Sequence, residues 1–245
     1  MTPIQIKICG ITNGDDATAC AELGAAMIGL NFYPESPRYV EPKAARRIVE
    51  ALPARVCAVG VFVDASTREI RSVAELTGIR SVQLHGDFAP EVCSELAHEF
   101  RVIRAFSTDA QFRPENISAY QDYDVLLDAH HPHLRGGTGH TCDWSSARAT
   151  LPFTRFLILS GGLNAQNVVR AIKAVGPHAV DVCSGVESAP DMKDHRAIKD
   201  FMCAVRMAEQ SLHAASADKA SQNVILIPQT REKDLGPISE RNSPK

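Results

Sequence analysis

The sequence predicts a single (β/α)8 TIM barrel, and two features indicate this fold class. Short apolar runs of strand length recur eight times along the 245-residue chain, and segments with helical spacing lie between most of them. The runs are apolar on both faces, which is typical of a parallel sheet covered by helices. Eight such units favour closure into a barrel over an open sheet, which usually has fewer strands.

The expected strands are apolar runs bounded by turn-forming or charged segments. In chain order they are 4–9, 27–32, 57–63, 81–85, 102–106, 123–128, 156–160 and 179–184. The first run is not followed by G-x-G-x-x-G, the turn with which an open sheet binds a dinucleotide. This absence also favours the barrel.

The connecting segments carry good helix formers, with apolar residues at helical spacing. The clear cases are 15–23, 42–52, 67–77, 90–99, 164–175 and 193–207. Two shorter segments, 116–120 and 144–150, follow the fifth and sixth strands and are weaker helix candidates.

The regular pattern ends near residue 209. Residues 210–245 are rich in Ser, Asn, Gln, Pro and charge, so we expect a barrel domain over 1–209 and a disordered tail over 210–245. An apolar island at 224–227 leaves open the alternative that the tail docks on the barrel or on a partner.

Composition argues against several classes of partner. The net charge is −3 with acids and bases interspersed, which gives no indication of a nucleic-acid or membrane surface. No apolar run reaches the roughly 18 residues that would span a bilayer, and the first residues do not resemble a signal peptide. The seven cysteines contain no C-x-x-C pair, which argues against a disulfide framework or a zinc site. We therefore expect a soluble, cytoplasmic protein.

Residues that follow the strands of such a barrel share one face, where enzymes of this fold place their chemistry. The sixth run ends at Asp128, and the loop after it closes with glycines at 136, 137 and 139, whose backbone can approach an anion. Gly161-Gly162 follows the seventh run, before a helix expected near Asn164, and Ser184-Gly185 follows the eighth. Three such loops on consecutive strands predict a phosphate site.

Cys9 ends the first run. A thiol, with an ordinary pKa of about 8.5, becomes a base near neutrality where its surroundings lower that value. The first and sixth strands face each other across an eight-stranded ring, so Cys9 and Asp128 would lie on opposite sides of a bound substrate. The alternative is that Cys9 is only a packing residue.

These residues together resemble one family. The matching pieces are K-I-C-G-I-T at 7–12, S-P-R at 36–38, Q-L-H-G at 83–86, L-L-D at 126–128, G-G-T-G at 136–139, D-W at 143–144, S-G-G-L-N at 160–164, D-V-C-S-G-V-E at 181–187 and K-D at 193–194. In this order and spacing, the chain resembles phosphoribosylanthranilate isomerase, the barrel enzyme of tryptophan biosynthesis, from residue 4 to about residue 207.

The resemblance implies an Amadori rearrangement of a small phosphosugar-anthranilate, without metal or cofactor, by a monomer or homodimer. By similarity, Asp128 is the general acid that opens the ribose ring and Cys9 is the general base that removes the C2′ proton. Arg38 resembles the residue that binds the anthranilate carboxylate. Matches to sugar or ring contacts are Gln83, His85 and Asp181, and the phosphate would rest on Gly137, Gly139, Gly161, Gly162, Ser184 and Gly185.

The chain departs from the family pattern at Cys142, where phenylalanine is usual, and at Cys183, where serine is usual. Three alternatives remain at this stage. Histidines at 130, 131, 133 and 140 with Cys142 could form a metal site, although their spacing is not that of a structural zinc site. The histidine-pathway isomerase performs the same rearrangement on an aminoimidazole substrate, but that family resembles this chain less, since it has a carboxylate where Cys9 stands. A non-catalytic barrel that only binds a phosphosugar or a partner is the third.

Overall fold

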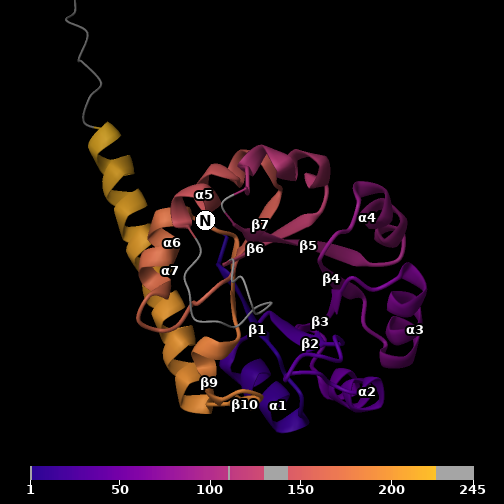
Figure 1. Ribbon diagram of the computed structural model, residues 1–245. Coiled ribbons are helices and arrows are strands. Elements are labelled where there is room, and N and C mark those ends of the chain that lie inside the picture. The colour runs from indigo at the N-terminus through magenta and orange to yellow at the C-terminus, as the bar shows by residue number, and fades with distance from the viewer. Residues whose placement is uncertain (1, 110, 130–142, 225–245) are drawn as a thin grey trace, which may run out of the picture.

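The computed structural model describes residues 2–109, 111–129 and 143–224, which form a closed ring of eight parallel strands (Figure 1). The strands pair in chain order, and the eighth pairs with the first to close the ring. Helices surround the ring in Figure 1, so each strand buries both of its faces. The expected (β/α)8 barrel is confirmed.

Every strand overlaps its expected apolar run. The strands are β1 (Gln5–Cys9), β2 (Met27–Asn31), β3 (Cys57–Val63), β4 (Ser81–His85), β5 (Arg101–Thr108), β6 (Asp124–Ala129), β7 (Phe156–Leu159) and β8 (Ala179–Val182). A small antiparallel pair, β9 (Glu187–Ala189) and β10 (Met192–Lys193), follows the eighth strand.

The helices are α1 (Gly14–Leu23), α2 (Pro42–Ala51), α3 (Thr67–Thr77), α4 (Pro90–Ala97), α5 (Trp144–Ala149), α6 (Val168–Val175) and α7 (His195–Val224). Three short 3-10 helices are η1 (Pro114–Tyr120), η2 (Leu151–Phe153) and η3 (Ser184–Val186). The two segments with weaker helical character thus became η1, a 3-10 helix after β5, and α5, a helix of six residues after β6.

Local side-chain chemistry sets several helix ends. The Asn13 side chain accepts a hydrogen bond from the Asp16 N–H at the start of α1, and Gly24 ends that helix in the left-handed conformation. Ser66 and Glu69 form a reciprocal capping box at the start of α3. These contacts satisfy backbone groups that a helix end leaves without intrahelical partners.

The apolar core has two parts. One fills the space between the strands and the surrounding helices, and the smaller one fills the inside of the barrel. The inner part consists of Met27, Val59, Ile103, Ala105, Leu126, Ile158 and Ala179. This inner layer of side chains therefore closes the barrel below its carboxyl-terminal face.

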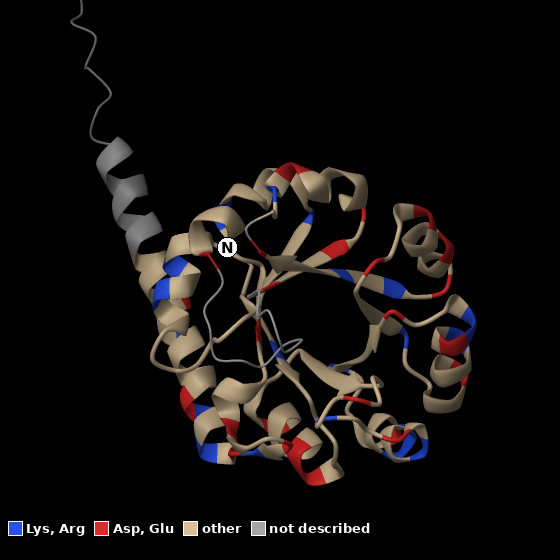
Figure 2. Ribbon diagram, viewed as in Figure 1, with Lys and Arg blue, Asp and Glu red and all other residues tan. Residues whose placement is uncertain are grey.

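Charged residues of both signs are distributed over the outer helices (Figure 2), in agreement with the interspersed charges of the sequence.

Helix α7 continues to Val224, past residue 209, where we expected the barrel domain to end. Residues 210–224 contain several alanines, and extending an existing helix avoids the cost of nucleating a new one. The rest of the expected tail, residues 225–245, lies outside the described residues.

Candidate active site

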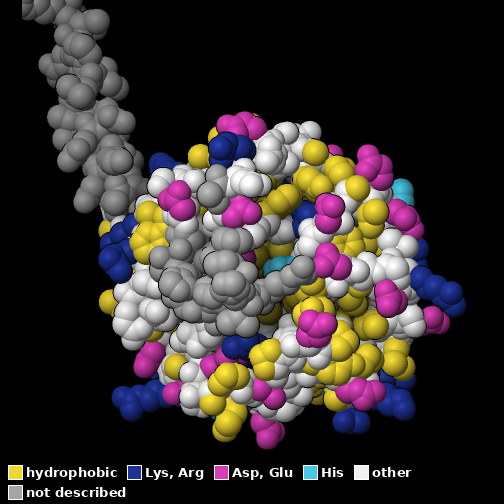
Figure 3. Space-filling view, viewed as in Figure 1, with side chains coloured by type: hydrophobic (Ala, Val, Ile, Leu, Met, Phe, Trp, Pro, Cys, Tyr) yellow, Lys and Arg dark blue, Asp and Glu magenta, His cyan; other side chains and the backbone are white. Residues whose placement is uncertain are grey.

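A cavity of about 510 Å³ lies at the carboxyl ends of the strands. It brings together six of the predicted site residues, which are Cys9, Arg38, Gln83, His85, Asp128 and Asp181. Each of these except Arg38 lies in the last residues of a strand, so the closed ring directs them to one place. In Figure 3 a histidine side chain is visible near the centre of this face, with hydrophobic and acidic side chains around it.

Cys9 is the last residue of β1 and is half-buried. The pKa of Cys9 is lowered to about 6, because the hydrogen bond with the Cys183 thiol and the positive charge of Lys7 together outweigh the opposing effect of burial. The same hydrogen bond, together with burial, raises the pKa of Cys183 well above its ordinary value. Cys183 therefore stays protonated, and its S–H donates a hydrogen bond to the Cys9 thiolate. Cys9 is then largely ionised at neutral pH, as a general base must be.

Lys7 lies beneath Cys9 and has no exposed surface. Its Nζ is 2.8 Å from Asp181 Oδ1, and the Ser160 hydroxyl donates to Asp181 Oδ2 at 3.0 Å. Burial alone would lower the pKa of Lys7, but the charges of Asp181 and Cys9 outweigh it and raise that pKa above its ordinary value. The Lys7 ammonium thus stays charged and stabilises both the Asp181 carboxylate and the Cys9 thiolate.

Gly29 of β2 makes room for this arrangement. A Cβ atom there would come within 2.7 Å of Cys9 Sγ and 3.0 Å of Lys7 Nζ. A side chain at position 29 would displace the base or its cation. The sequence analysis assigned no role to Lys7, Gly29 or Ser160, although two of them fall within the matching motifs.

Arg38 is bound on one edge by Glu187. Its Nε and Nη2 donate to the two carboxylate oxygens of Glu187 at 2.8 and 2.6 Å, and Lys193 Nζ lies 2.6 Å from Glu187 Oε1. Burial opposes ionisation of Glu187, but Arg38 and Lys193 outweigh it and lower its pKa. The pair holds the guanidinium plane in one orientation and leaves its Nη1 edge outside this bidentate contact. Neither Glu187 nor Lys193 was predicted, and only their places in the matching motifs pointed to them.

Gln83 and His85 are two positions apart in β4, so their side chains lie on the same face of the strand and both line the cavity. The Gln83 amide nitrogen contacts the His85 ring, whereas the Gln83 amide oxygen is buried and has no hydrogen-bond partner within the described residues. A buried oxygen of this kind is ready to accept a hydrogen bond from a bound hydroxyl group.

The predicted phosphate residues are only partly described. Gly137 and Gly139 lie outside the described residues. Gly161 and Gly162 both have positive φ, at 88° and 60°, and their N–H groups donate no hydrogen bond within the described part of the chain. Ser184 and Gly185 begin η3, where a Cβ on Gly185 would overlap the carbonyl oxygen of Leu163. The loops after β7 and β8 therefore lie against each other, and Gly185 is required for that close approach.

The helix expected to begin near Asn164 begins at Val168 instead. The Asn164 side chain accepts hydrogen bonds from the N–H groups of Gln166 and Asn167, so a turn precedes the regular helix. These two amides are occupied within the protein. The N–H groups of Gly161 and Gly162, in contrast, donate no hydrogen bond to any residue that the structure describes.

No group of three or more metal-ligating side chains occurs among the residues that the structure describes. The histidines at 130, 131, 133 and 140, with Cys142, lie outside them. Within the described ranges, no helix has the length and apolar character to cross a membrane.

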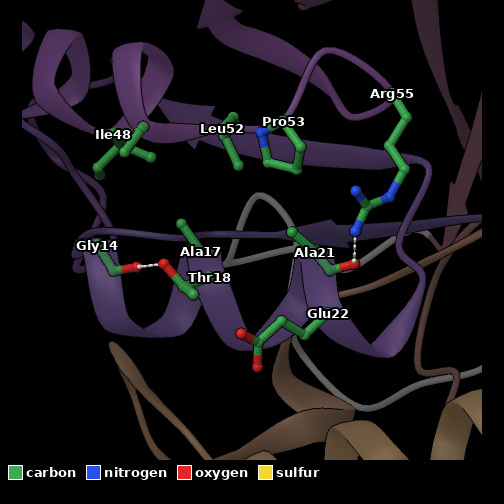
Figure 4. Close-up of a pocket in the computed structure, with 10 residues that line it drawn as sticks. Gly14, Ala17, Thr18, Ala21, Glu22, Ile48, Leu52, Pro53 and Arg55 are labelled. Carbon is green, nitrogen blue, oxygen red and sulfur yellow. Dashed lines mark hydrogen bonds between the residues drawn. The ribbon is translucent and has the colours of Figure 1, made fainter.

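A second cavity, of about 170 Å³, lies outside the barrel between α1 and α2. Figure 4 shows its mainly aliphatic lining, with the Arg55 guanidinium bonded to the Ala21 carbonyl at one edge. It contains no thiol or imidazole, and Glu22 is its one carboxylate. Among the described residues, the groups suited to acid–base chemistry are therefore gathered in the larger cavity.

The chain is similar to known proteins over most of the barrel. The family model described as N-(5'phosphoribosyl)anthranilate (PRA) isomerase matches residues 6–204. The N-(5'-phosphoribosyl)anthranilate isomerase of Thermotoga maritima is 44% identical over 199 residues, which cover 81% of this chain and 97% of that protein. A crystal structure of phosphoribosyl anthranilate isomerase in complex with reduced 1-(o-carboxyphenylamino)-1-deoxyribulose 5-phosphate superposes with a TM-score of 0.75 at 41% identity, covering 83% of this chain and 98% of that chain.

Another similar structure contains monomers generated from the dimeric isomerase of Thermotoga maritima, with a TM-score of 0.75 at 40% identity and coverage of 83% and 98%. The match of the family model extends over most of the barrel, and the identities are high over nearly the full length of the relatives. The chain belongs to the N-(5'-phosphoribosyl)anthranilate isomerase family.

Proposed function

We propose that this chain converts N-(5-phospho-β-D-ribosyl)anthranilate into 1-(2-carboxyphenylamino)-1-deoxy-D-ribulose 5-phosphate by an Amadori rearrangement, the third step of tryptophan synthesis from chorismate. The observation that carries the proposal is the meeting of Cys9, with its lowered pKa, and Asp128 in one cavity at the strand ends. The two groups come from strands β1 and β6, which are not neighbours in the ring. A substrate between them meets an acid on one side and a base on the other.

The reaction needs two proton transfers, and each group is suited to one of them. Asp128 in its protonated form donates a proton to the furanose ring oxygen, and the C1′–O bond breaks to give a Schiff base with the anthranilate nitrogen. The Cys9 thiolate then removes the C2′ proton, and the resulting enolamine tautomerises to the ketone. Each positioned acid or base contributes roughly 10²–10⁴ to the rate. No electrons leave the substrate, so no cofactor is needed.

Binding groups surround these two residues. The guanidinium of Arg38, oriented by Glu187, has its Nη1 edge available for the anthranilate carboxylate. Gln83, His85 and Asp181 line the cavity where the sugar hydroxyls would lie. The phosphate is assigned to the loops that contain Gly137, Gly139, Gly161, Gly162, Ser184 and Gly185, and the unbonded amides of the described pair support this assignment.

The test is a fluorescence assay that follows loss of N-(5-phosphoribosyl)anthranilate with the purified protein, beside the aminoimidazole substrate of the histidine pathway. We expect turnover of the first substrate. Turnover of only the second would assign the chain to the histidine-pathway reaction. Binding of either substrate without turnover would support a non-catalytic barrel, and size-exclusion chromatography with light scattering would distinguish monomer from homodimer.

A further inference from the structure

The two cysteines of the cavity lie side by side at the carboxyl ends of two neighbouring strands. β1 and β8 pair in parallel with Ile8 opposite Val182, and Cys9 and Cys183 are the next residues on each chain segment. Paired strands are about 4.8 Å apart, within the range of roughly 4.4–6.8 Å that disulfides require between Cα atoms. Both thiols are free, half-buried and part of the cavity lining. Their positions allow a disulfide to form with little movement of the backbone.

Their surroundings make the two thiols chemically unequal. Cys9 faces the Lys7 ammonium and carries the lowered pKa, whereas Cys183 retains its proton. Lys193 Nζ lies 3.8 Å from Cys183 Sγ, so a second cation lies close to the pair. Oxidation-sensitive cysteines are typically accessible thiolates next to a second, resolving thiol. Cys9 fits the role of the oxidised thiolate, and Cys183 fits the role of the resolving thiol.

A serine hydroxyl at position 183 could also donate a hydrogen bond to Cys9, but it could not form a disulfide with it. The proposed isomerase reaction makes no use of the sulfur of Cys183. The presence of a thiol at position 183 therefore needs an explanation other than the isomerase reaction.

We propose that Cys9 and Cys183 form an oxidative modification site, which a hydroperoxide converts into an intramolecular disulfide. The Cys9 thiolate attacks the peroxide oxygen, the O–O bond breaks, and the leaving oxygen takes up a proton, which gives a sulfenic acid on Cys9. The Cys183 sulfur then attacks the Cys9 sulfur, the S–O bond breaks, and water leaves with the Cys183 proton. With hydrogen peroxide, two thiols lose two protons and two electrons, and two waters form.

The disulfide removes the proposed base from the isomerase reaction, so oxidation stops turnover until a dithiol reductant restores both thiols. This loss of activity rests on the proposed function. Formation of the disulfide does not rest on it, because mass spectrometry detects the disulfide without an activity assay. A chain that forms the disulfide but lacks isomerase activity would refute only the proposed function.

The experiment exposes the full chain to hydrogen peroxide, blocks free thiols, and analyses tryptic peptides without reduction. We expect a peptide pair joined through Cys9 and Cys183, the loss of two hydrogen atoms in the intact mass, and full reversal by dithiothreitol. Cys203→Ser is the matched control, since Cys203 is exposed on α7 away from the cavity, and the same linkage should form in it.

Cys183→Ser supplies the second measurement. Without the resolving thiol, the sulfenic acid on Cys9 should persist and be trapped by dimedone, whereas the wild-type chain should yield the disulfide and little adduct. Overoxidation of Cys9 in the wild-type chain without a cross-link, linkage between two chains, or equal dimedone labelling of both proteins would each overturn the proposal.

Discussion

Replacing Cys183 by alanine removes the hydrogen bond that most strongly favours the Cys9 thiolate. A hydrogen bond to a charged group contributes about 1.5–3 kcal/mol, which corresponds to roughly one to two pKa units. The pKa of Cys9 should therefore rise from about 6 to the range of about 7–8. Because the base acts only when ionised, the activity that is present above this pKa is lost as pH falls through it.

The assay is the pH dependence of kcat/KM, which reports ionisations of the free enzyme. The acid limb should move to higher pH in Cys183→Ala, so that activity at pH 6.5 falls by about eightfold for a rise of about 1.5 pKa units, while activity well above pH 8 changes little. The rate of Cys9 alkylation by iodoacetamide should show the same shift. Cys183→Ser, which keeps a donor, should restore an acid limb close to that of the wild-type chain.

An acid limb that stays near pH 6 in Cys183→Ala would refute this reasoning. It would mean that the ammonium groups of Lys7 and Lys193, and not the hydrogen bond from Cys183, lower the pKa of Cys9. An acid limb of kcat/KM that moves to higher pH in both Cys183→Ala and Cys183→Ser would show that the size of the sulfur atom, and not hydrogen-bond donation, determines the effect.

Three further predictions address the remaining groups of the site. Cys9→Ser and Asp128→Asn should each reduce kcat by at least about a hundredfold with unchanged circular dichroism, and near-normal kcat in either would remove that residue from its proposed role. Arg38→Ala should chiefly raise KM for the carboxylated substrate, so an unchanged KM would show that Arg38 does not bind the carboxylate. Lys7→Met leaves the buried carboxylate of Asp181 without its cation and should lower the free energy of unfolding by about 3–5 kcal/mol in urea titrations, whereas an exposed substitution such as Lys43→Met should change it little.

The connection between Arg38 and Glu187 was not foreseen in the sequence. Arg38 was predicted to bind a substrate carboxylate, yet the structure places a carboxylate of the protein on its Nε and Nη2 edge. The two residues are 149 positions apart, and no local pattern relates them. The ion pair explains how an arginine in a loop can be held in one orientation before substrate arrives.

The sequence by itself determined the barrel and most of its elements. Apolar runs of strand length and helical spacing are local properties, so they predicted every strand of the barrel and most helices within a few residues. The prediction was less accurate where a local pattern was weak. The start of α6 moved from Asn164 to Val168, because the asparagine side chain forms a turn before the regular helix begins. Helix α7 continued beyond residue 209, because extending a helix costs less than starting one.

The motifs also identified which residues belong to the site, since six predicted side chains line one cavity. Only the tertiary structure decided how they act on one another. The pKa of Cys9 depends on Lys7 from its own strand and on Cys183, which directly follows β8, and closure of the ring brings these groups within reach. Electrostatic effects and hydrogen bonds fall off over a few ångströms of space and not over positions in a chain, so the chemistry of the site is a property of the closed barrel.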